Sequence, residues 1–255
     1  ARQIDEAALE GVDAVIHLAG ERIDGRWTAT KKRRILDSRV EGTEVLAGAL
    51  AGLGRPPAVV VSASAVGFYG DRGDEELTED SPPGTGFLAE VCERWEAAAA
   101  PIASPDTRLV LARTGIVCAP DGGALGRMLA LTRLGLGGRL GNGRQWWSWI
   151  TLEDEVRALL HLLDTPVAGP MNLVAPGTCR NAEFVRTLAR ALRRPAVLPA
   201  PALALRAVLG EMANGLLLAS ARVQPVGLED SGFSFRSPDL TSAIAELLSP
   251  GRPRS

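Results

Sequence analysis

Lysine and tyrosine are nearly absent from this sequence of 255 residues. Lys31 and Lys32 are the only lysines, Tyr69 is the only tyrosine, and every other basic residue is an arginine. Since Gly73 stands four positions after Tyr69, no helix can carry a tyrosine and a lysine one turn apart as an acid–base pair. This scarcity excludes any mechanism that depends on such a pair.

The sequence also lacks a dominant charge and a long apolar run. The 28 basic and 30 acidic side chains leave a net charge of −2, so a nucleic-acid partner is not expected. The longest apolar stretch, residues 200–223, is interrupted by Arg206 and Glu211 and predicts no membrane span. The N-terminus has neither the basic flank nor the apolar run of a signal peptide. We therefore expect a cytoplasmic protein that binds neither nucleic acid nor membrane.

Cysteine is scarce as well. Cys92, Cys118 and Cys179 are odd in number, widely spaced and set among apolar residues, a pattern that argues against disulfides or a metal cluster. We expect three buried, reduced thiols and no metal site. With 46% apolar and 23% charged residues, the chain has the composition of a globular protein with a sizeable core.

Short apolar runs alternate with longer segments of helical period, which predicts an α/β fold with a mainly parallel sheet. The predicted strands are residues 13–18, 58–62, 108–113 and 171–174. The predicted helices are residues 30–53, 87–100, 123–134, 152–163 after Thr151, and a helix capped by Asn181 that ends at Arg193.

The sequence changes character after Pro195. Prolines become frequent, two segments rich in Leu and Ala have helical period, and residues 232–235 (Gly-Phe-Ser-Phe) alternate between small and aromatic side chains. We predict a main domain of residues 1–194 and a small C-terminal appendage, residues 195–250, packed on the main sheet.

Three unusual loops follow three predicted strands, at the edge of the sheet where ligands bind in such folds. Residues 17–21 include the small residues Ala19 and Gly20, which either let a ligand approach the backbone or form a simple strand exit. Residues 62–70 carry hydroxyl groups that either contact a reacting oxygen or satisfy backbone groups. Residues 113–117 begin with Arg113, which either anchors the sheet by an ion pair or contacts an anion.

These loops belong to an ordered series of motifs that extends over nearly the whole chain. The series includes His17-Leu18-Ala19-Gly20-Glu21, Ser62-Ala63-Ser64-Ala65-Val66-Gly67-Phe68-Tyr69-Gly70, Trp95-Glu96, Arg113-x-Gly115-Ile116-Val117, Ser148-Trp149-Ile150, Asp154 and Leu209-Gly210-Glu211. In this series the sequence resembles the atypical extended short-chain dehydrogenase/reductases, and within them the sugar-nucleotide-epimerase-like "epimerase family protein" group with its own C-terminal domain.

The resemblance implies a Rossmann-like, doubly wound parallel sheet that is incomplete at its N-terminus. The family opens with a strand, a Gly-x-x-Gly-x-x-Gly turn and a helix that together hold the cofactor diphosphate. That unit takes roughly 30 residues, and only about a dozen precede the first predicted strand here. Gly135, Gly138 and Gly141 fit the spacing but do not lead from a strand into a helix, so we reject them. We expect a truncated chain or a lost phosphate site.

The resemblance also bears on catalysis. Ordinary members of the superfamily use Tyr-x-x-x-Lys on a helix, and Leu88 and Cys92 stand at the matching positions of this chain. Ser64 matches the superfamily's catalytic serine, and Tyr69 matches the Tyr-Gly ending of its loop. We take Ser64 and Tyr69 as the catalytic candidates.

The cofactor implied by the resemblance is NADP or NAD, and NADP is favoured. The residues expected along it are Leu18, Ala19, Gly20, Arg39, Ser62, Ala63, Ile116 and Val117. Arg113 and Trp149 are the candidates for contact with the substrate, and for Trp149 a place in the core is an equal alternative.

The implied function is that of an NAD(P)-binding oxidoreductase or epimerase-like protein acting on a sugar nucleotide or a related carbonyl or carbinol compound. Two alternatives stay open, a non-catalytic dinucleotide-binding or sensing protein and an inactive fragment. The expected partner is a small-molecule substrate, and a homodimer is the family expectation.

Overall fold

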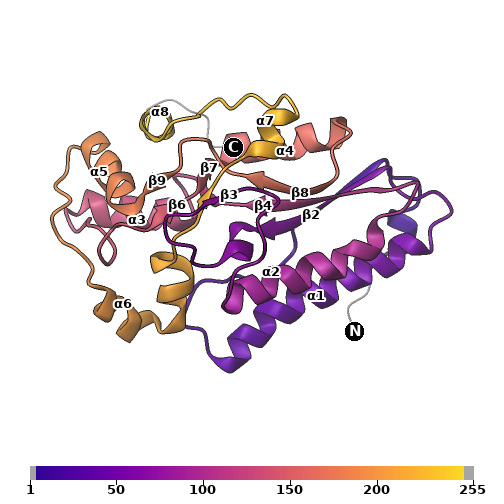
Figure 1. Ribbon diagram of the computed structural model, residues 1–255, viewed down its shortest axis with the longest axis horizontal. Coiled ribbons are helices and arrows are strands. Elements are labelled where there is room, and N and C mark those ends of the chain that lie inside the picture. Colours follow the sequence, from indigo (N-terminus) through magenta and orange to yellow (C-terminus); the bar gives the residue numbers. More distant parts are fainter. Residues whose placement is uncertain (1–3, 250–255) are drawn as a thin grey trace.

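A four-stranded parallel sheet lies at the centre of the computed structural model, which describes residues 4–249 (Figure 1). Its strand order is β1 (Ala14–His17), β2 (Val59–Ala65), β4 (Arg108–Thr114) and β8 (Gly169–Leu173). The register aligns Ser64 of β2 with Arg113 of β4, and Arg113 with Asn172 of β8. The side chains of Ser64, Arg113 and Asn172 therefore project from neighbouring positions at the carboxyl end of the sheet.

Helices cover both faces of this sheet (Figure 1). The helices α1 (Ala29–Ala51) and α2 (Phe87–Ala99) pack against one face, and α4 (Leu152–Asp164) packs against the other. Thr28 caps α1 and Thr151 caps α4, since each hydroxyl accepts a hydrogen bond from the backbone N–H three residues later. The predicted α/β fold with a parallel sheet is confirmed.

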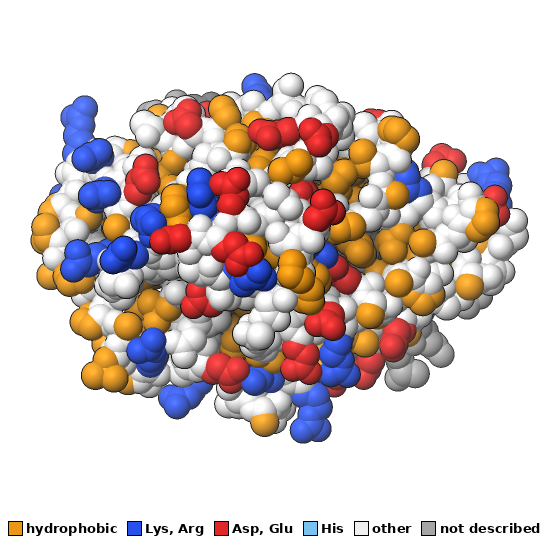
Figure 2. Space-filling view, viewed as in Figure 1, with side chains coloured by type: hydrophobic (Ala, Val, Ile, Leu, Met, Phe, Trp, Pro, Cys, Tyr) orange, Lys and Arg blue, Asp and Glu red, His pale blue; other side chains and the backbone are white. Residues whose placement is uncertain are grey.

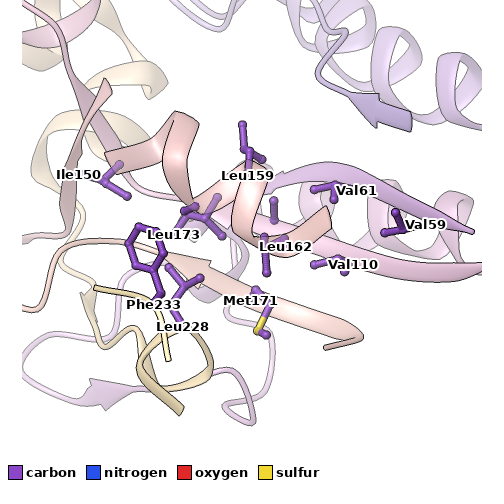
Figure 3. Packing of buried hydrophobic residues seen from close by; sticks show 12 residues of the cluster. Val59, Val61, Val110, Ile150, Leu159, Leu162, Met171, Leu173, Leu228 and Phe233 are labelled. Carbon is purple, nitrogen blue, oxygen red and sulfur yellow. The ribbon is translucent and has the colours of Figure 1, made fainter. Parts of the chain in front are cut away.

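The alternation of side chains along β2 explains the two cores. Val60 packs on the α1 side with Leu46 and Leu50, whereas Val59 and Val61 face α4, because successive strand residues point to opposite faces. Figure 3 shows the α4 side, where side chains from β2, β4, β8, the short strand that contains Ile150, and α4 meet Leu228 and Phe233 of the C-terminal segment. The shared cluster comprises Val59, Val61, Val110, Ala112, Ile150, Ala158, Leu159, Leu162, Met171, Leu173, Leu228 and Phe233.

Shorter elements surround the sheet, and those between β5 and α5, together with α8, build a second apolar cluster around Trp147, Trp149 and Phe184. They are η1 (Glu6–Ala8), η2 (Val66–Tyr69), β3 (Glu76–Leu77), η3 (Ala100–Ile102), β5 (Ile116–Cys118), α3 (Gly123–Arg133), β6 (Trp146–Trp147), β7 (Trp149–Thr151), β9 (Cys179–Arg180), α5 (Asn181–Ala191), α6 (Ala202–Leu209), the π-helix η4 (Ala213–Leu218), β10 (Arg222–Val223), α7 (Val226–Asp230) and α8 (Leu240–Leu247).

The C-terminal segment is tied to the rest of the chain. Strand β10 pairs with β3, and α7 and α8 pack against β8 and α5. Asp154, fully buried in the first turn of α4, accepts hydrogen bonds from the backbone N–H groups of Arg236 and Ser237. The segment therefore shares the core of the main sheet, as predicted for the appendage, while the domain boundary itself stays a prediction.

One local prediction is wrong. Asn181 does not cap α5, because Arg180 is the residue at the cap and the Asn181 side chain accepts a hydrogen bond from the backbone of Leu140 instead. A tertiary contact therefore uses the side chain that the local pattern assigned to the helix cap. The alternating residues 232–235 form no regular element, and Phe233 packs edge-on against Phe235 and His161.

The predictions about the cysteines are confirmed, since Cys92, Cys118 and Cys179 are buried and free. No cluster of metal-ligating side chains is found among residues 4–249. Within the same residues, no helix has the length and apolar character needed to cross a bilayer.

Candidate functional site

The loop after β1 presents backbone at the carboxyl end of the sheet. Leu18, Ala19 and Gly20 are exposed, Leu18 to 58%. A Cβ on Gly20 would stand 3.1 Å from Cζ of Arg39, which lies behind the loop. Arg39 donates hydrogen bonds to the backbone oxygens of Glu21 and Ile35. Arg39 therefore holds this loop against α1. The exposed side of the loop consists of backbone and the side chains of Leu18 and Ala19.

The hydroxyl of Ser64 is bound to a carboxylate from the neighbouring helix. Ser64 Oγ donates to Glu96 Oε1 of α2 over 2.6 Å. Arg113 holds the same carboxylate with two bonds of 2.8 Å, from Nε to Oε1 and from Nη2 to Oε2. The side chains of Arg113 and Glu96 are 5% and 10% exposed, so this is a buried bidentate ion pair. Of the two alternatives for Arg113, the structure favours the ion-pair anchor.

The guanidinium of Arg113 has further partners. Its Nη1 donates to Tyr69 Oη over 3.0 Å and to the backbone oxygen of Glu79 over 3.1 Å. Its Cζ lies 3.6 Å from the centre of the Phe68 ring, a cation–π contact. Burial by itself lowers the pKa of this guanidinium, but the hydrogen bond to Glu96 and the adjacent negative charge outweigh burial and raise it.

Tyr69 lies in the core and not at an open surface. Its exposed fraction is 0%, and its hydroxyl donates to Asn172 Oδ1 over 2.7 Å while accepting from Arg113. Burial raises the pKa of the phenol above its usual value. The structure therefore contradicts the expectation of a phenol that exchanges protons with a bound substrate, because both sides of the hydroxyl are occupied by buried protein groups.

Leu88 and Cys92, at the positions matched to Tyr and Lys, face the loop after Ser64. A Cβ on Gly67 would stand 3.2 Å from Leu88 Cβ and 3.6 Å from Cys92 Sγ. Burial raises the pKa of the Cys92 thiol to about 12, so the thiol stays protonated. Neither side chain can replace the acid–base chemistry of the expected pair.

The opposite face of the sheet holds an acid that the sequence analysis did not single out. Thr114 Oγ1 donates to Glu155 Oε1 over 2.8 Å, while Glu155 Oε2 is buried and has no hydrogen-bond partner among the described residues. Burial raises the pKa of this carboxyl to about 7. One signal was available, because Glu155 shares a helical face with Ala158, Leu159 and Leu162.

The other residues predicted to contact the cofactor or the substrate are less exposed than residues 18–20. Ser62 is fully buried, and Ala63, Ile116 and Val117 are partly buried. Trp149 is also fully buried, and its indole N–H donates to the backbone oxygen of Gly177 over 2.9 Å. Of its two alternatives, a place in the core matches this structure, because a side chain without exposed surface cannot line a pocket.

The rejection of the glycine series is confirmed. Gly135, Gly138 and Gly141 lie in the irregular segment between α3 and β6, with no strand before them and no helix directly after them. The backbone N–H of Gly141 instead donates to the backbone oxygen of Ala200, so the segment that contains these glycines is hydrogen-bonded to the residues just before α6.

Two family models match the chain. Residues 1–174 match the NAD dependent epimerase/dehydratase family, and residues 200–247 match a domain of unknown function, DUF1731. An epimerase family protein of Mycobacterium bovis is 46% identical over 244 residues, which cover 95% of this chain and 80% of that protein. The human epimerase family protein SDR39U1 is 38% identical over 252 residues, which cover 96% of this chain and 86% of that protein.

Solved structures agree with this fold. A crystal structure of human SDR39U1 (isoform 2) with NADPH has a TM-score of 0.90 at 37% identity and covers 94% of this chain and 82% of that chain. A crystal structure of the nucleoside-diphosphate sugar epimerase from Corynebacterium glutamicum has a TM-score of 0.78 at 36% identity, covering 96% of this chain and 48% of that chain.

Proposed function

Because this chain belongs to the NAD dependent epimerase/dehydratase family, we propose that it binds NADP or NAD across the carboxyl ends of β1, β2 and β4. The proposed reaction is hydride transfer at a carbinol or carbonyl carbon of a nucleotide sugar or a related compound. The likeness to human SDR39U1 with NADPH supports NADP. The likeness to a nucleoside-diphosphate sugar epimerase supports the substrate class.

The observation that carries the proposal is the open backbone of Leu18, Ala19 and Gly20, in line with Ser64 at the same end of the sheet. Small residues let a ribose and its phosphates lie close to the main chain. Among residues 4–249, no Gly-x-x-Gly-x-x-Gly turn leads from a strand directly into an α-helix, so the fit concerns the ribose, the side of the diphosphate next to residues 18–20, and the nicotinamide. The bound cofactor would supply or accept the hydride.

The protein's own part in the reaction would be to orient the substrate oxygen. Ser64 is 4% exposed. Its Oγ donates a hydrogen bond to Glu96, so an oxygen lone pair remains that could accept from a substrate hydroxyl. Arg113 fixes Glu96, and through it the rotation of the serine hydroxyl. Ser64 thus contacts the substrate oxygen, and Glu96 and Arg113 act as positioning residues for the serine hydroxyl.

A non-catalytic dinucleotide-binding protein is the second candidate. The observation that favours it is that no free proton carrier stands beside Ser64 among the described residues, since Leu88 is apolar, the pKa of Cys92 is about 12, Tyr69 is buried and the Glu96 carboxylate is held by Arg113. Hydride transfer to or from an alcohol requires a matching proton transfer. In this candidate the same residues bind the cofactor and no reaction follows.

Cofactor binding is tested by calorimetric titration of the protein with NADPH. The variant Ala19→Asp places a negative charge on the exposed loop, next to the expected diphosphate, and should weaken binding at least about tenfold, or 1.4 kcal/mol. Ala97→Asp puts the same charge on an exposed position of α2 and should leave binding unchanged. Equal affinity in all three proteins would contradict the proposed path of the cofactor.

Turnover then separates the two candidates. Absorbance at the nicotinamide band is followed with UDP-glucose, UDP-glucuronic acid and simple carbonyl compounds. For the enzyme we expect turnover that falls in Ser64→Ala while the affinity for NADPH stays the same. Tight NADPH binding without turnover on any compound would support the non-catalytic candidate.

A further inference from the structure

Exposed apolar side chains gather at one end of the molecule, on two segments that are far apart in sequence. Residues 134–139 follow α3, and residues 197–209 lead into and form α6. Hydrogen bonds join the segments, from Leu198 N to Gly137 O and from Ala200 N to Arg139 O. The large apolar side chains that stand exposed there are Leu134, Leu136, Val197, Leu198, Leu203 and Val208. We call this surface, with the arginines described below, the α3–α6 surface.

Helix α6 contributes an unpartnered apolar stripe. None of its residues is buried, and Leu203, Ala204, Ala207 and Val208 are all exposed. Their spacing places them on one side of the helix. Leu203 is 78% and Val208 71% exposed. Side chains with so much open surface stand on a convex face and do not line a pocket for a small molecule.

The charge of this end differs from that of the whole chain. Residues 122–152 and 184–210 contain arginines but not one aspartate or glutamate, although the chain as a whole has a net charge of −2. Arg133, Arg139, Arg193 and Arg194 are exposed and adjoin the apolar side chains in sequence. Figure 2 shows Lys/Arg and hydrophobic side chains side by side at the end that carries α5 and α6 in Figure 1.

We propose that the α3–α6 surface docks on the surface of an anionic lipid bilayer. A convex apolar stripe can enter the boundary between headgroups and acyl chains, and arginines beside it can pair with lipid phosphates and carboxylates. A nucleic acid would pair with the arginines but leave the leucines and valines exposed to water. A neutral apolar partner would cover the leucines and valines but leave the arginines without a counter-charge. This docking needs no membrane-spanning segment and is independent of the proposed cofactor.

The test is flotation of the protein with vesicles of phosphatidylcholine, with and without phosphatidylserine. We expect binding to the anionic vesicles only, and weaker binding at high salt. The double variant Leu203→Asp/Val208→Asp should reduce binding about tenfold or more. The control Val156→Asp/Leu160→Asp introduces the same two charges at exposed apolar residues of α4 and should bind like the wild type. Thermal melts monitored by circular dichroism establish that each variant is folded.

A second variant tests the charge. Arg193→Glu/Arg194→Glu should abolish the preference for anionic over neutral vesicles while leaving the melt unchanged, since both side chains are exposed. Absence of binding to anionic vesicles would overturn the proposal, and so would equal binding to both vesicle types or equal binding by Leu203→Asp/Val208→Asp and wild type. Concentration-dependent dimerisation through this surface, without binding to vesicles, would also overturn it.

Discussion

The side chains of two consecutive residues of β4 point to opposite faces of the sheet, and buried charge is stabilised differently on each face. Arg113 faces α2, where its ion pair with Glu96 is joined by Ser64 and Tyr69. Thr114 faces α4, where it meets Glu155, whose second oxygen has no partner among residues 4–249. Strand alternation alone separates the two sides. The same strand end therefore carries one complete polar network and one incomplete one.

The difference shows how each side reduces the cost of burial. On the α2 face each charge finds an opposite charge and further hydrogen bonds, which offset its desolvation. On the α4 face no cation among residues 4–249 balances Glu155, and burial instead raises its pKa to about 7. Stability on the first side depends on geometry, whereas stability on the second side depends on pH.

The largest effect is expected from breaking the ion pair. Arg113→Met leaves the Glu96 carboxylate buried without its cation, which should lower the free energy of unfolding by about 3–5 kcal/mol. Urea unfolding monitored by fluorescence measures it. The double variant Arg113→Met/Glu96→Leu removes both charges and should recover part of the loss. A single variant as stable as the wild type would mean that the pair contributes nothing to the network.

The second effect appears only as a dependence on pH. A carboxyl whose pKa is raised on folding stabilises the protein below its unfolded pKa, and this contribution is lost as the pH rises through the folded value of about 7. Glu155→Gln keeps an acceptor for Thr114 but cannot ionise. Relative to the wild type, the variant should therefore gain roughly 3 kcal/mol between about pH 4 and pH 8. Urea unfolding at both pH values measures this gain, and parallel pH profiles would contradict it.

The smallest effect compares two serines on the same face of β2. Ser62 Oγ is buried without a hydrogen-bond partner in the described part of the chain, so Ser62→Ala should change the free energy of unfolding by less than about 0.5 kcal/mol. Ser64→Ala removes a hydrogen bond to a charged group and should cost about 1.5–3 kcal/mol. An equal loss in the free energy of unfolding of the two variants would contradict the idea that only the hydrogen-bonded hydroxyl stabilises the fold.

The periodic elements were predictable from sequence to within a few residues. The predicted strand of residues 58–62 is the exception, because β2 continues to Ala65, where small residues gave no apolar signal. The candidate site was only partly predictable. Ser64 and Arg113 were found as polar residues at strand ends, but Glu96 was not, although it continues the helix face of Leu88 and Cys92 at a spacing of four.

By itself, the sequence determined the parallel α/β fold, the reduced buried cysteines and the absence of a Tyr-x-x-x-Lys pair. These properties depend on composition and on the spacing of residues within one element. Only the tertiary structure decided that Arg113 pairs with Glu96, that Tyr69 is buried, that Glu155 finds no counter-charge among residues 4–249, and that residues 137 and 139 are hydrogen-bonded to residues 198 and 200. Periodicity tells which face of an element turns inward, but the partner across that face is fixed only when separate elements pack together.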